Sequence, residues 1–344
     1  MSANPVLVEV TRGDMVESRH RGAVAVVRAD GELIASLGDI SRLIYPRSAI
    51  KPIQALFLIE SGAADALGLS DKELALACAS HNGEPEHVDT VRAWLARMGL
   101  DGNALECGAH PPRRGKDRKA LIEQGLDPSP MHNNCSGKHA GFLSSAYHLR
   151  LPVEGYIKRS HPVQRAVLDI LAQLSGANLD HEPEGLDGCG IPVVGIGLRP
   201  LARAFAAFVS REALGSRRAD AAGRIFDAMV SQPFMVAGSG RWCTRAMQAG
   251  QGAFIVKTGA EGVFCAAVPQ AQIGIALKID DGAARAAEHA MGAVLSCVPH
   301  LAQYFQNENR ELISSAIHNV AGKEVGEIRP APDIREQLRV ALSG

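Results

Sequence analysis

The sequence predicts an α+β fold in which both chain ends contribute to an antiparallel sheet and a largely helical insert lies between them. Short apolar and β-branched stretches, separated by turn residues, occur near the N-terminus and again in the C-terminal third. In the middle of the chain, apolar residues recur at helical spacing. We therefore expect residues 1–80 together with 250–344 to form a sheet-containing subdomain and residues 81–249 a mainly helical subdomain.

The individual elements follow from these patterns and from the turn signals between them. The predicted strands are residues 6–10, 22–28, 33–37, 252–257, 262–268 and 273–279. The predicted helices include residues 50–64, 71–79, 84–98, 161–174, 200–209, 217–230 and 282–297, and one that the segment 132–139 opens and that ends near residue 148. Residues 105–130 are rich in glycine, proline and charge, which is typical of a solvated loop.

Composition excludes several classes of function. A formal net charge of −1, without a long basic run, argues against nucleic acid as a partner. No stretch approaches the roughly 18 apolar residues of a membrane span, and residues 1–9 do not resemble a signal peptide. The seven cysteines are odd in number and widely scattered, which is not typical of a secreted disulfide framework. We expect a cytoplasmic protein.

The first chemical feature is a serine followed three residues later by a lysine. Ser48 and Lys51 stand at the start of an apolar helical pattern, and Pro52 indicates that the helix begins near Ser48, since proline is tolerated only in the first turn. Residues three apart share one helix face, so Lys51 can reach the Ser48 hydroxyl. The simpler alternative is that Ser48 caps a helix and Lys51 is a surface lysine.

A lysine can activate a serine only if it loses its proton. A free lysine, with a pKa of about 10.4, is neutral about once in a thousand at pH 7.4, so its pKa must fall by roughly 3 units, or about 4 kcal/mol. Burial and a second nearby ammonium can together supply this. Lys257, in Lys257-Thr258-Gly259 at the end of a predicted strand, is the second lysine that the sequence offers.

Three short motifs occur along the chain in this order: Ser-x-x-Lys at 48–51, Ser-x-Asn at 80–82 and Lys-Thr-Gly at 257–259. This is the three-part signature of serine β-lactamases and penicillin-binding proteins. In this interpretation Ser48 attacks an acyl carbon, Lys51 takes its proton, and Ser80 with Lys257 passes a proton to the leaving amine. The backbone N–H groups of Ser48 and, by analogy, Ala260 would form the oxyanion hole.

Five longer motifs extend the similarity over nearly the whole chain. They are Arg47-Ser-Ala-Ile-Lys-Pro52, Ala79-Ser-His-Asn-Gly-Glu84, His132-Asn-Asn-Cys-Ser-Gly-Lys-His139, Asp187-Gly-Cys-Gly190 and Lys257-Thr-Gly-Ala-Glu-Gly262. Together they resemble the L-asparaginase II family, the serine-dependent, rhizobial-type asparaginases with a serine β-lactamase-like fold. The resemblance implies hydrolysis of L-asparagine through an acyl-enzyme on Ser48, with Lys51, Ser80 and Lys257 completing two Ser-Lys pairs. It also implies a homodimer.

The resemblance further implies a metal, expected to be Zn²⁺, held by Cys135, Lys138 and Cys189. Thiolates are good zinc ligands, whereas lysine coordinates only as a neutral amine, and water would take the open fourth position. The alternative is that both cysteines are small buried hydrophobes. Because the lysines already supply a base, we expect the metal to shape the substrate pocket.

Other polar residues in these motifs are candidates for substrate binding. Arg47 and His139 could hold the substrate carboxylate, while Asn82, Asn133 or Asp187 could hold its ammonium or amide; a turn or cap role is the alternative for each. A glutaminase or another β-lactamase-like serine amidohydrolase remains open, because one methylene is worth only about 1–3 kcal/mol in a pocket. A non-catalytic zinc-thiolate or redox-sensing protein is the alternative from a different class.

Overall fold

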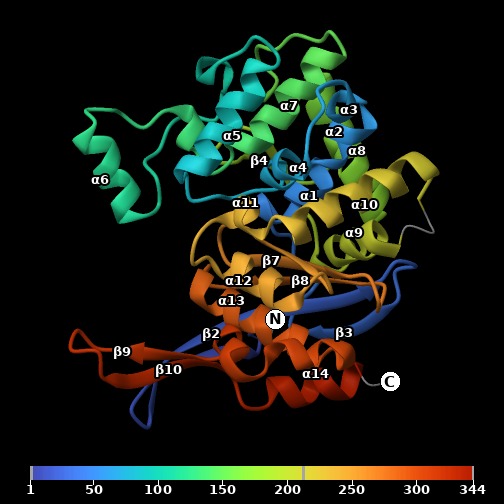
Figure 1. The fold of residues 1–344 in the computed structure, drawn as a ribbon. Coiled ribbons are helices and arrows are strands. Elements are labelled where there is room, and N and C mark those ends of the chain that lie inside the picture. The colour runs from blue at the N-terminus through green and yellow to red at the C-terminus, as the bar shows by residue number, and fades with distance from the viewer. Residues whose placement is uncertain (1–2, 211–213, 343–344) are drawn as a thin grey trace. The chain divides into compact units, whose positions relative to one another are not determined.

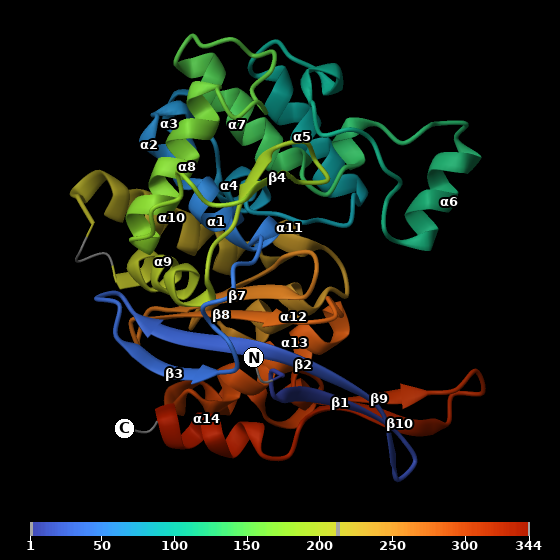
Figure 2. The ribbon, with the colours of Figure 1, turned by 180° about the vertical axis from the view of Figure 1, so that it is seen from behind.

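The computed structural model describes residues 3–210 and 214–342. The chain divides into two compact units, which Figures 1 and 2 show from opposite sides. The first, here called the sheet unit, comprises Met1–Ala49, Gly195–Ser210 and Arg245–Gly344. The second, called the helical unit, comprises Ile50–Val194 and Arg211–Thr244. Each unit therefore collects segments that are far apart in the sequence.

Within the described residues, the sheet unit contains an antiparallel sheet of eight strands. The order is β6-β7-β8-β2-β1-β10-β9, with β3 also paired to β2. Their bounds are β1 (Val6–Arg12), β2 (Met15–Arg28), β3 (Leu33–Leu37), β6 (Ile255–Thr258), β7 (Val263–Val268), β8 (Ile273–Ile279), β9 (Ser315–His318) and β10 (Glu324–Pro330). Because β2 pairs with β8 and β1 with β10, both chain ends build one sheet. The predicted fold class, a mixed α+β fold with this sheet and a helical middle, is confirmed.

Helices cover the central strands on both sides. Figures 1 and 2 show α9 (Leu198–Ser210) on one side of β7 and β8, and α13 (Ala284–Cys297) and α14 (Ile334–Leu342) on the other. All residues of β7 are buried, as expected for a strand covered on both faces. The approach of α9 is close, because a Cβ on Gly274 of β8 would lie 1.9 Å from the Ala202 carbonyl oxygen. The C-terminal pieces β9, β10 and α14 were not among the predicted elements.

The helical unit is built around α4 (Asp71–Ala77) and α7 (Ser136–His148). Ser70 and Glu73 cap α4 reciprocally, with the Ser70 N–H donating to Glu73 at 3.0 Å. The remaining helices are α1 (Lys51–Gln54), α2 (Leu56–Glu60), α3 (Ala63–Ala66), α5 (Pro85–Ala96), α6 (Gly115–Glu123), α8 (Pro162–Ser175), α10 (Ser216–Ser231) and α11 (Pro233–Ala237). A small hairpin of β4 (Glu184–Leu186) and β5 (Pro192–Val194) completes the unit. The single helix expected over residues 50–64 is thus divided into α1, α2 and α3.

Residues 50–80, 195–210 and 245–249 are grouped differently from the predicted subdomains. Residues 50–80 lie in the helical unit, because α2 and α4 pack against α7 and α10. Gly195–Ser210 lies in the sheet unit, because α9 packs against β2 and β8. Within the described residues, no helix combines the length and hydrophobicity needed to cross a membrane.

The predicted loop of residues 105–130 contains a helix. Figure 1 shows α6 standing away from the other helices of its unit, and none of its residues is buried. It begins at Gly115, after a run of proline and arginine, and ends where Gly125 adopts a positive φ. The expectation of solvent exposure was correct for α6, whereas the expectation of irregular backbone was wrong.

Candidate active site

Ser48 lies in a short 3-10 turn, η1 (Arg47–Ile50), that leads directly into α1. Pro52 occupies the first turn of α1, as its missing N–H group allows. Arg47 has a φ of +51°, in the left-handed region that side chains with a Cβ rarely adopt. Such strain persists only where surrounding contacts fix the backbone. One of these is the hydrogen bond from the Ala49 N–H to the Pro46 carbonyl at 3.1 Å, which closes the turn around Ser48.

The Lys-Thr-Gly segment lies against this turn within the sheet unit. A Cβ on Gly259 would come within 2.8 Å of the Pro46 carbonyl oxygen and 3.2 Å of the Ala49 nitrogen, so the approach requires glycine. Lys257, near the end of β6, is 1% exposed, and its Nζ donates to the Thr258 carbonyl at 2.7 Å. The sheet unit thus places the Ser48 turn beside the segment that carries Lys257.

Lys51 is the first residue of α1 and is 0% exposed, so the alternative of a surface lysine is wrong. Its Nζ donates to Ser80 Oγ at 3.2 Å, to Cys135 Sγ at 3.2 Å and to the Ala79 carbonyl. A buried ammonium is tolerated only with such partners. Within the helical unit, this single group joins the Ser80 loop to the start of α7.

Cys135, Lys138 and Cys189 converge in the helical unit. Lys138 Nζ lies 3.0 Å from Cys189 Sγ, and the Cys189 thiol donates a hydrogen bond to Cys135. That bond lowers the pKa of Cys135 against the effect of burial, and the charges of Lys51 and Lys138 lower the pKa further. The same bond, with burial, raises the pKa of Cys189. Burial alone would lower the pKa of Lys138, yet the neighbouring cysteine sulfurs raise it.

This cluster fits the donor set that the resemblance implies for a metal. Lys138 Nζ contacts Cys189 Sγ, Cys189 is hydrogen-bonded to Cys135, and the lowered pKa of Cys135 favours the thiolate that zinc binds. In the described part of the chain, no group of three His, Cys, Asp or Glu side chains is placed to hold a metal ion. A metal at this cluster would therefore take the lysine amine as its third protein ligand.

Asn82 and Asn133 use their side-chain amides within the protein. Asn133 Nδ2 donates to the carbonyls of Cys107 at 2.8 Å and Gly108 at 3.0 Å, and its Oδ1 accepts the Cys135 N–H at 2.8 Å. Asn82 Nδ2 donates to Glu84 at 3.0 Å and to the Ser239 carbonyl at 3.2 Å. These contacts favour the turn-stabilising role that the sequence left as an alternative for both residues.

His139 offers a buried donor. Its Nδ1 lies 2.7 Å from the Tyr156 hydroxyl, which also accepts the Glu106 N–H at 2.9 Å. The hydroxyl proton is therefore directed to Nδ1, and the ring proton resides on Nε2. Burial lowers the pKa of His139, and the Lys138 and Lys51 charges add to this, so the ring is neutral. Among the described residues, Nε2 has no hydrogen-bond partner.

The remaining predicted substrate ligands lie in turns. Asp187 is in the turn between β4 and β5, two residues before Cys189, and its carboxylate accepts the Gly188 N–H at 2.7 Å. Arg47 precedes Ser48 and is half-buried. Ala260 is exposed and begins a turn that the Val263 N–H closes onto the Ala260 carbonyl at 3.4 Å.

A loop that the sequence does not predict contacts the Ser80 segment. This loop, residues 236–241, begins in the last residues of α11, and the Val236 carbonyl accepts the Ser80 N–H at 3.0 Å. Arg241 Nη1 donates to the Ser80 carbonyl at 3.2 Å. The available signal was Gly238-Ser239-Gly240, a run of small residues between two helices, which marks a tight loop but does not identify its neighbour.

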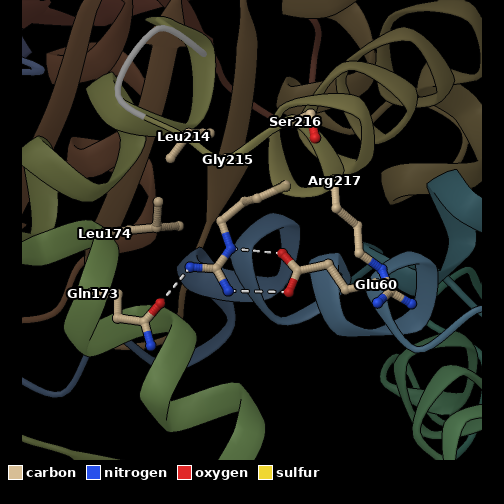
Figure 3. A pocket seen from close by; sticks show the side chains of 8 residues that line it. Glu60, Gln173, Leu174, Leu214, Gly215, Ser216 and Arg217 are labelled. Atoms are coloured by element: carbon tan, nitrogen blue, oxygen red, sulfur yellow. Dashed lines mark hydrogen bonds and ion pairs between the residues drawn. The ribbon is translucent and has the colours of Figure 1, made fainter.

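A hollow of about 550 Å³ lies elsewhere in the helical unit, beside the start of α10. In Figure 3, dashed lines join one guanidinium in this hollow to Glu60 and to Gln173. This is Arg218, with contacts of 2.6 Å and 3.0 Å to Glu60 and 2.6 Å to Gln173. None of the predicted site residues lines this hollow, and Arg218 already has protein partners in it.

None of the curated proteins matches the sequence significantly. Among solved structures, the chain is similar to Mglu in its native form, with 14% identity, a TM-score of 0.44, and coverage of 78% of this chain and 59% of Mglu. It is also similar to a β-lactamase from Mycobacterium bovis (17% identity, TM-score 0.40, 83% of this chain and 95% of the other).

A β-lactamase/D-alanine carboxypeptidase from Pseudomonas syringae is similar at 13% identity and a TM-score of 0.37, with coverage of 76% of this chain and 89% of the other. The family model for L-asparaginase II matches residues 8–330. That match includes the Ser48 turn, the Ser80 loop, the cysteine cluster and the Lys257 segment. The chain belongs to the L-asparaginase II family.

Proposed function

We propose that the protein is an L-asparaginase that hydrolyses L-asparagine to L-aspartate and ammonia through an acyl-enzyme on Ser48. Family membership supports the reaction class. The structural observation that best supports the serine mechanism is the burial of Lys51 against Ser80 Oγ and Cys135 Sγ. A merely structural lysine at a helix start would keep its ammonium in water.

In the first half of the reaction, the Ser48 hydroxyl attacks the side-chain amide carbon of asparagine. Lys51 in its neutral form accepts the hydroxyl proton, and the developing oxyanion accepts hydrogen bonds from the N–H groups of Ser48 and Ala260. The left-handed conformation of Arg47 is consistent with Ser48 as nucleophile, since a strained backbone just before a nucleophile can present the nucleophile's side chain to a ligand.

Collapse of the tetrahedral intermediate breaks the C–N bond. The departing nitrogen needs one proton to leave as ammonia, and Ser80 supplies it with Lys257 as its partner. Water then attacks the acyl carbon, its proton is taken by the same lysines, and the Ser48 oxygen regains a proton as aspartate leaves.

Substrate recognition falls mainly to Arg47, His139 and Asp187. Arg47 and the buried Nε2–H donor of His139 suit a carboxylate, and the Asp187 carboxylate suits the substrate ammonium. The amides of Asn82 and Asn133 already have protein partners, so we assign them the task of holding the Ser80 and Cys135 loops.

Cys135, Lys138 and Cys189 would hold the metal, which we take to be Zn²⁺. When bound, it supplies a positive charge that organises the pocket around the substrate. Binding requires Lys138 to release its proton, and the raised pKa of Lys138 makes metal uptake favour alkaline pH.

The decisive experiment compares ammonia release from L-asparagine by the intact chain and by Ser48→Ala. We expect release by the intact chain and a loss of about 10³-fold or more in the variant. Equal rates in both would exclude the serine mechanism. The same assay with L-glutamine gives the kcat/KM ratio, and a ratio that favours glutamine would reassign the substrate. Sedimentation of the intact protein tests the expected homodimer.

A further inference from the structure

Glu84 ends the Ala79–Glu84 motif, and the reaction outlined above assigns it no role. It is a buried carboxylate at the N-terminus of α5. Its oxygens accept hydrogen bonds from the Ser239 N–H at 2.7 Å, the Ser239 hydroxyl at 2.7 Å and the Asn82 amide at 3.0 Å. Arg114 donates a further, charged hydrogen bond. A buried carboxylate with this many donors is stabilised as an anion.

These contacts join two loops of the helical unit. Asn82, held by Glu84, also donates to the Ser239 carbonyl at 3.2 Å, and its Oδ1 accepts from Arg241 at 3.3 Å. Gly238 packs directly against both Glu84 and Asn82, because a Cβ there would sit 2.6 Å from Glu84 Oε1 and 2.7 Å from Asn82 Nδ2. The Ser80–Glu84 loop and the Val236–Arg241 loop therefore pack as one element.

Ser80 is fixed by this element rather than by its own side chain alone. Its N–H donates to the Val236 carbonyl at 3.0 Å, and its carbonyl accepts from Arg241 at 3.2 Å. Both partners belong to the loop that Glu84 holds through Ser239. The position of Ser80 Oγ, 3.2 Å from Lys51 Nζ, thus depends on backbone contacts that the Glu84 carboxylate organises.

We propose that Glu84 is a positioning residue that fixes Ser80 beside Lys51 by binding the Val236–Arg241 loop through Ser239. The proposal rests on the proposed function, because its readout is asparagine hydrolysis, and it adds a residue to the proton-transfer machinery without contact to substrate. Glu84→Gln is the sharpest change, since it keeps the side-chain shape but replaces one acceptor oxygen with a donor that faces Ser239 and Arg114.

The test is a double-mutant cycle on the full chain, with Glu84→Gln, Ser80→Ala and the double variant. We expect Glu84→Gln alone to lower kcat by about 10- to 100-fold with KM changed by less than about threefold. In the Ser80→Ala background, the same change should cost less than about threefold, because the group it positions is gone. Equal losses in both backgrounds would show a general structural effect and overturn the proposal.

Glu86→Gln is the matched control, because Glu86 lies two residues further along the same helix with an exposed side chain that pairs with Lys72. It should retain wild-type kcat. If the intact chain does not release ammonia from asparagine, the proposed function fails before any variant is compared. If the intact chain is active and Glu84→Gln is equally active, only the positioning role fails.

Two further measurements test the proposal if Ser80→Ala is too weak to assay or if Glu84→Gln does not fold. A crystal structure of Glu84→Gln should show Ser80 Oγ outside hydrogen-bond distance of Lys51 Nζ, and an unchanged contact would overturn the proposal. Ser239→Ala removes one hydroxyl donor and leaves the backbone N–H bond, so we expect a folded protein with kcat reduced by about three- to tenfold. Wild-type kcat in this variant would count against the role of the loop.

Discussion

Lys51 Nζ lies 3.2 Å from Cys135 Sγ, so the proposed base of the serine mechanism is in direct contact with a proposed metal ligand. The pair is buried, and in a poorly solvated environment a charge on one atom acts strongly on the other. The proposed base and a proposed metal ligand, which the sequence presents as separate features, are therefore joined by one contact in the helical unit.

The first prediction concerns the two buried lysines. Lys51→Met and Lys257→Met keep the aliphatic part of each side chain and remove its nitrogen, so each should lower kcat by about 10²- to 10⁴-fold, the usual contribution of a positioned proton-transfer group. Steady-state kinetics with L-asparagine measures this, and thermal unfolding confirms that the variants are folded.

The exposed lysines Lys72 and Lys323 provide matched controls for the helical and sheet units. Lys72→Met and Lys323→Met should leave kcat unchanged. Near-full activity in either Lys51→Met or Lys257→Met would rule out a mechanism that needs both lysines.

The second prediction concerns the metal cluster. Exhaustive chelation, and separately Cys189→Ala, should abolish bound zinc and raise KM for asparagine several-fold with a smaller change in kcat, because a metal that shapes the pocket acts on substrate binding. Elemental analysis gives the zinc content, and kinetics gives both constants.

Cys107→Ala is the control for this experiment. Cys107 is a buried cysteine in the same unit, and burial raises the pKa of its thiol to about 12, so it stays protonated. The control should retain zinc. A protein that purifies without metal and has an unchanged KM after chelation would contradict the assignment. If metal loss changes kcat as much as KM, the Lys51–Cys135 contact transmits the metal's charge to the base.

Periodicity was sufficient to predict most of the fold. The strand patterns at both ends predicted the sheet, because β2 and β8 have apolar stretches whose burial is readable from local sequence. The pieces that were missed, such as β10 and α6, are partly or wholly exposed, so their sequences lack an apolar stripe. Their conformation depends on neighbours and on local caps.

The candidate site, like the fold, could be predicted only in part from the sequence. Spacing alone pointed to Ser48 and Lys51, and the structure adds that Lys51 is buried against Ser80 and Cys135. The tasks of Asn82 and Asn133 could not be separated from the sequence, because an amide in a turn can serve either a ligand or the backbone. The Val236–Arg241 loop could not be found at all, since its contact with Ser80 spans more than 150 residues.

The third prediction concerns Gly259. Gly259→Ala places a Cβ 2.8 Å from the Pro46 carbonyl oxygen, closer than real Cβ contacts, so the Ser48 turn or the β6 end must move. A displacement near 1 Å at a reacting group can cost about 100-fold in rate, and we expect a loss of about that size in kcat. Gly115→Ala is the control, because its Cβ meets open space. Wild-type kcat in Gly259→Ala would show that the close packing of this segment is not needed for turnover.

The fourth prediction concerns acid stability. The donors around Glu84 outweigh burial, which alone would raise the pKa, and lower the pKa of this carboxyl from 4.5 to about 2. Because the folded-state pKa lies below the unfolded one, the stabilisation from ionised Glu84 is fully present above about pH 4.5 and is lost as the pH falls towards 2. A shift of this size corresponds to at most about 3 kcal/mol. The difference in the free energy of unfolding between wild type and Glu84→Gln should therefore be constant from pH 5 to 7 and shrink steadily below pH 4.5, as urea titrations at a series of pH values would show. A difference that does not change down to pH 2.5 would mean that Glu84 is not held as a charged group in the folded protein.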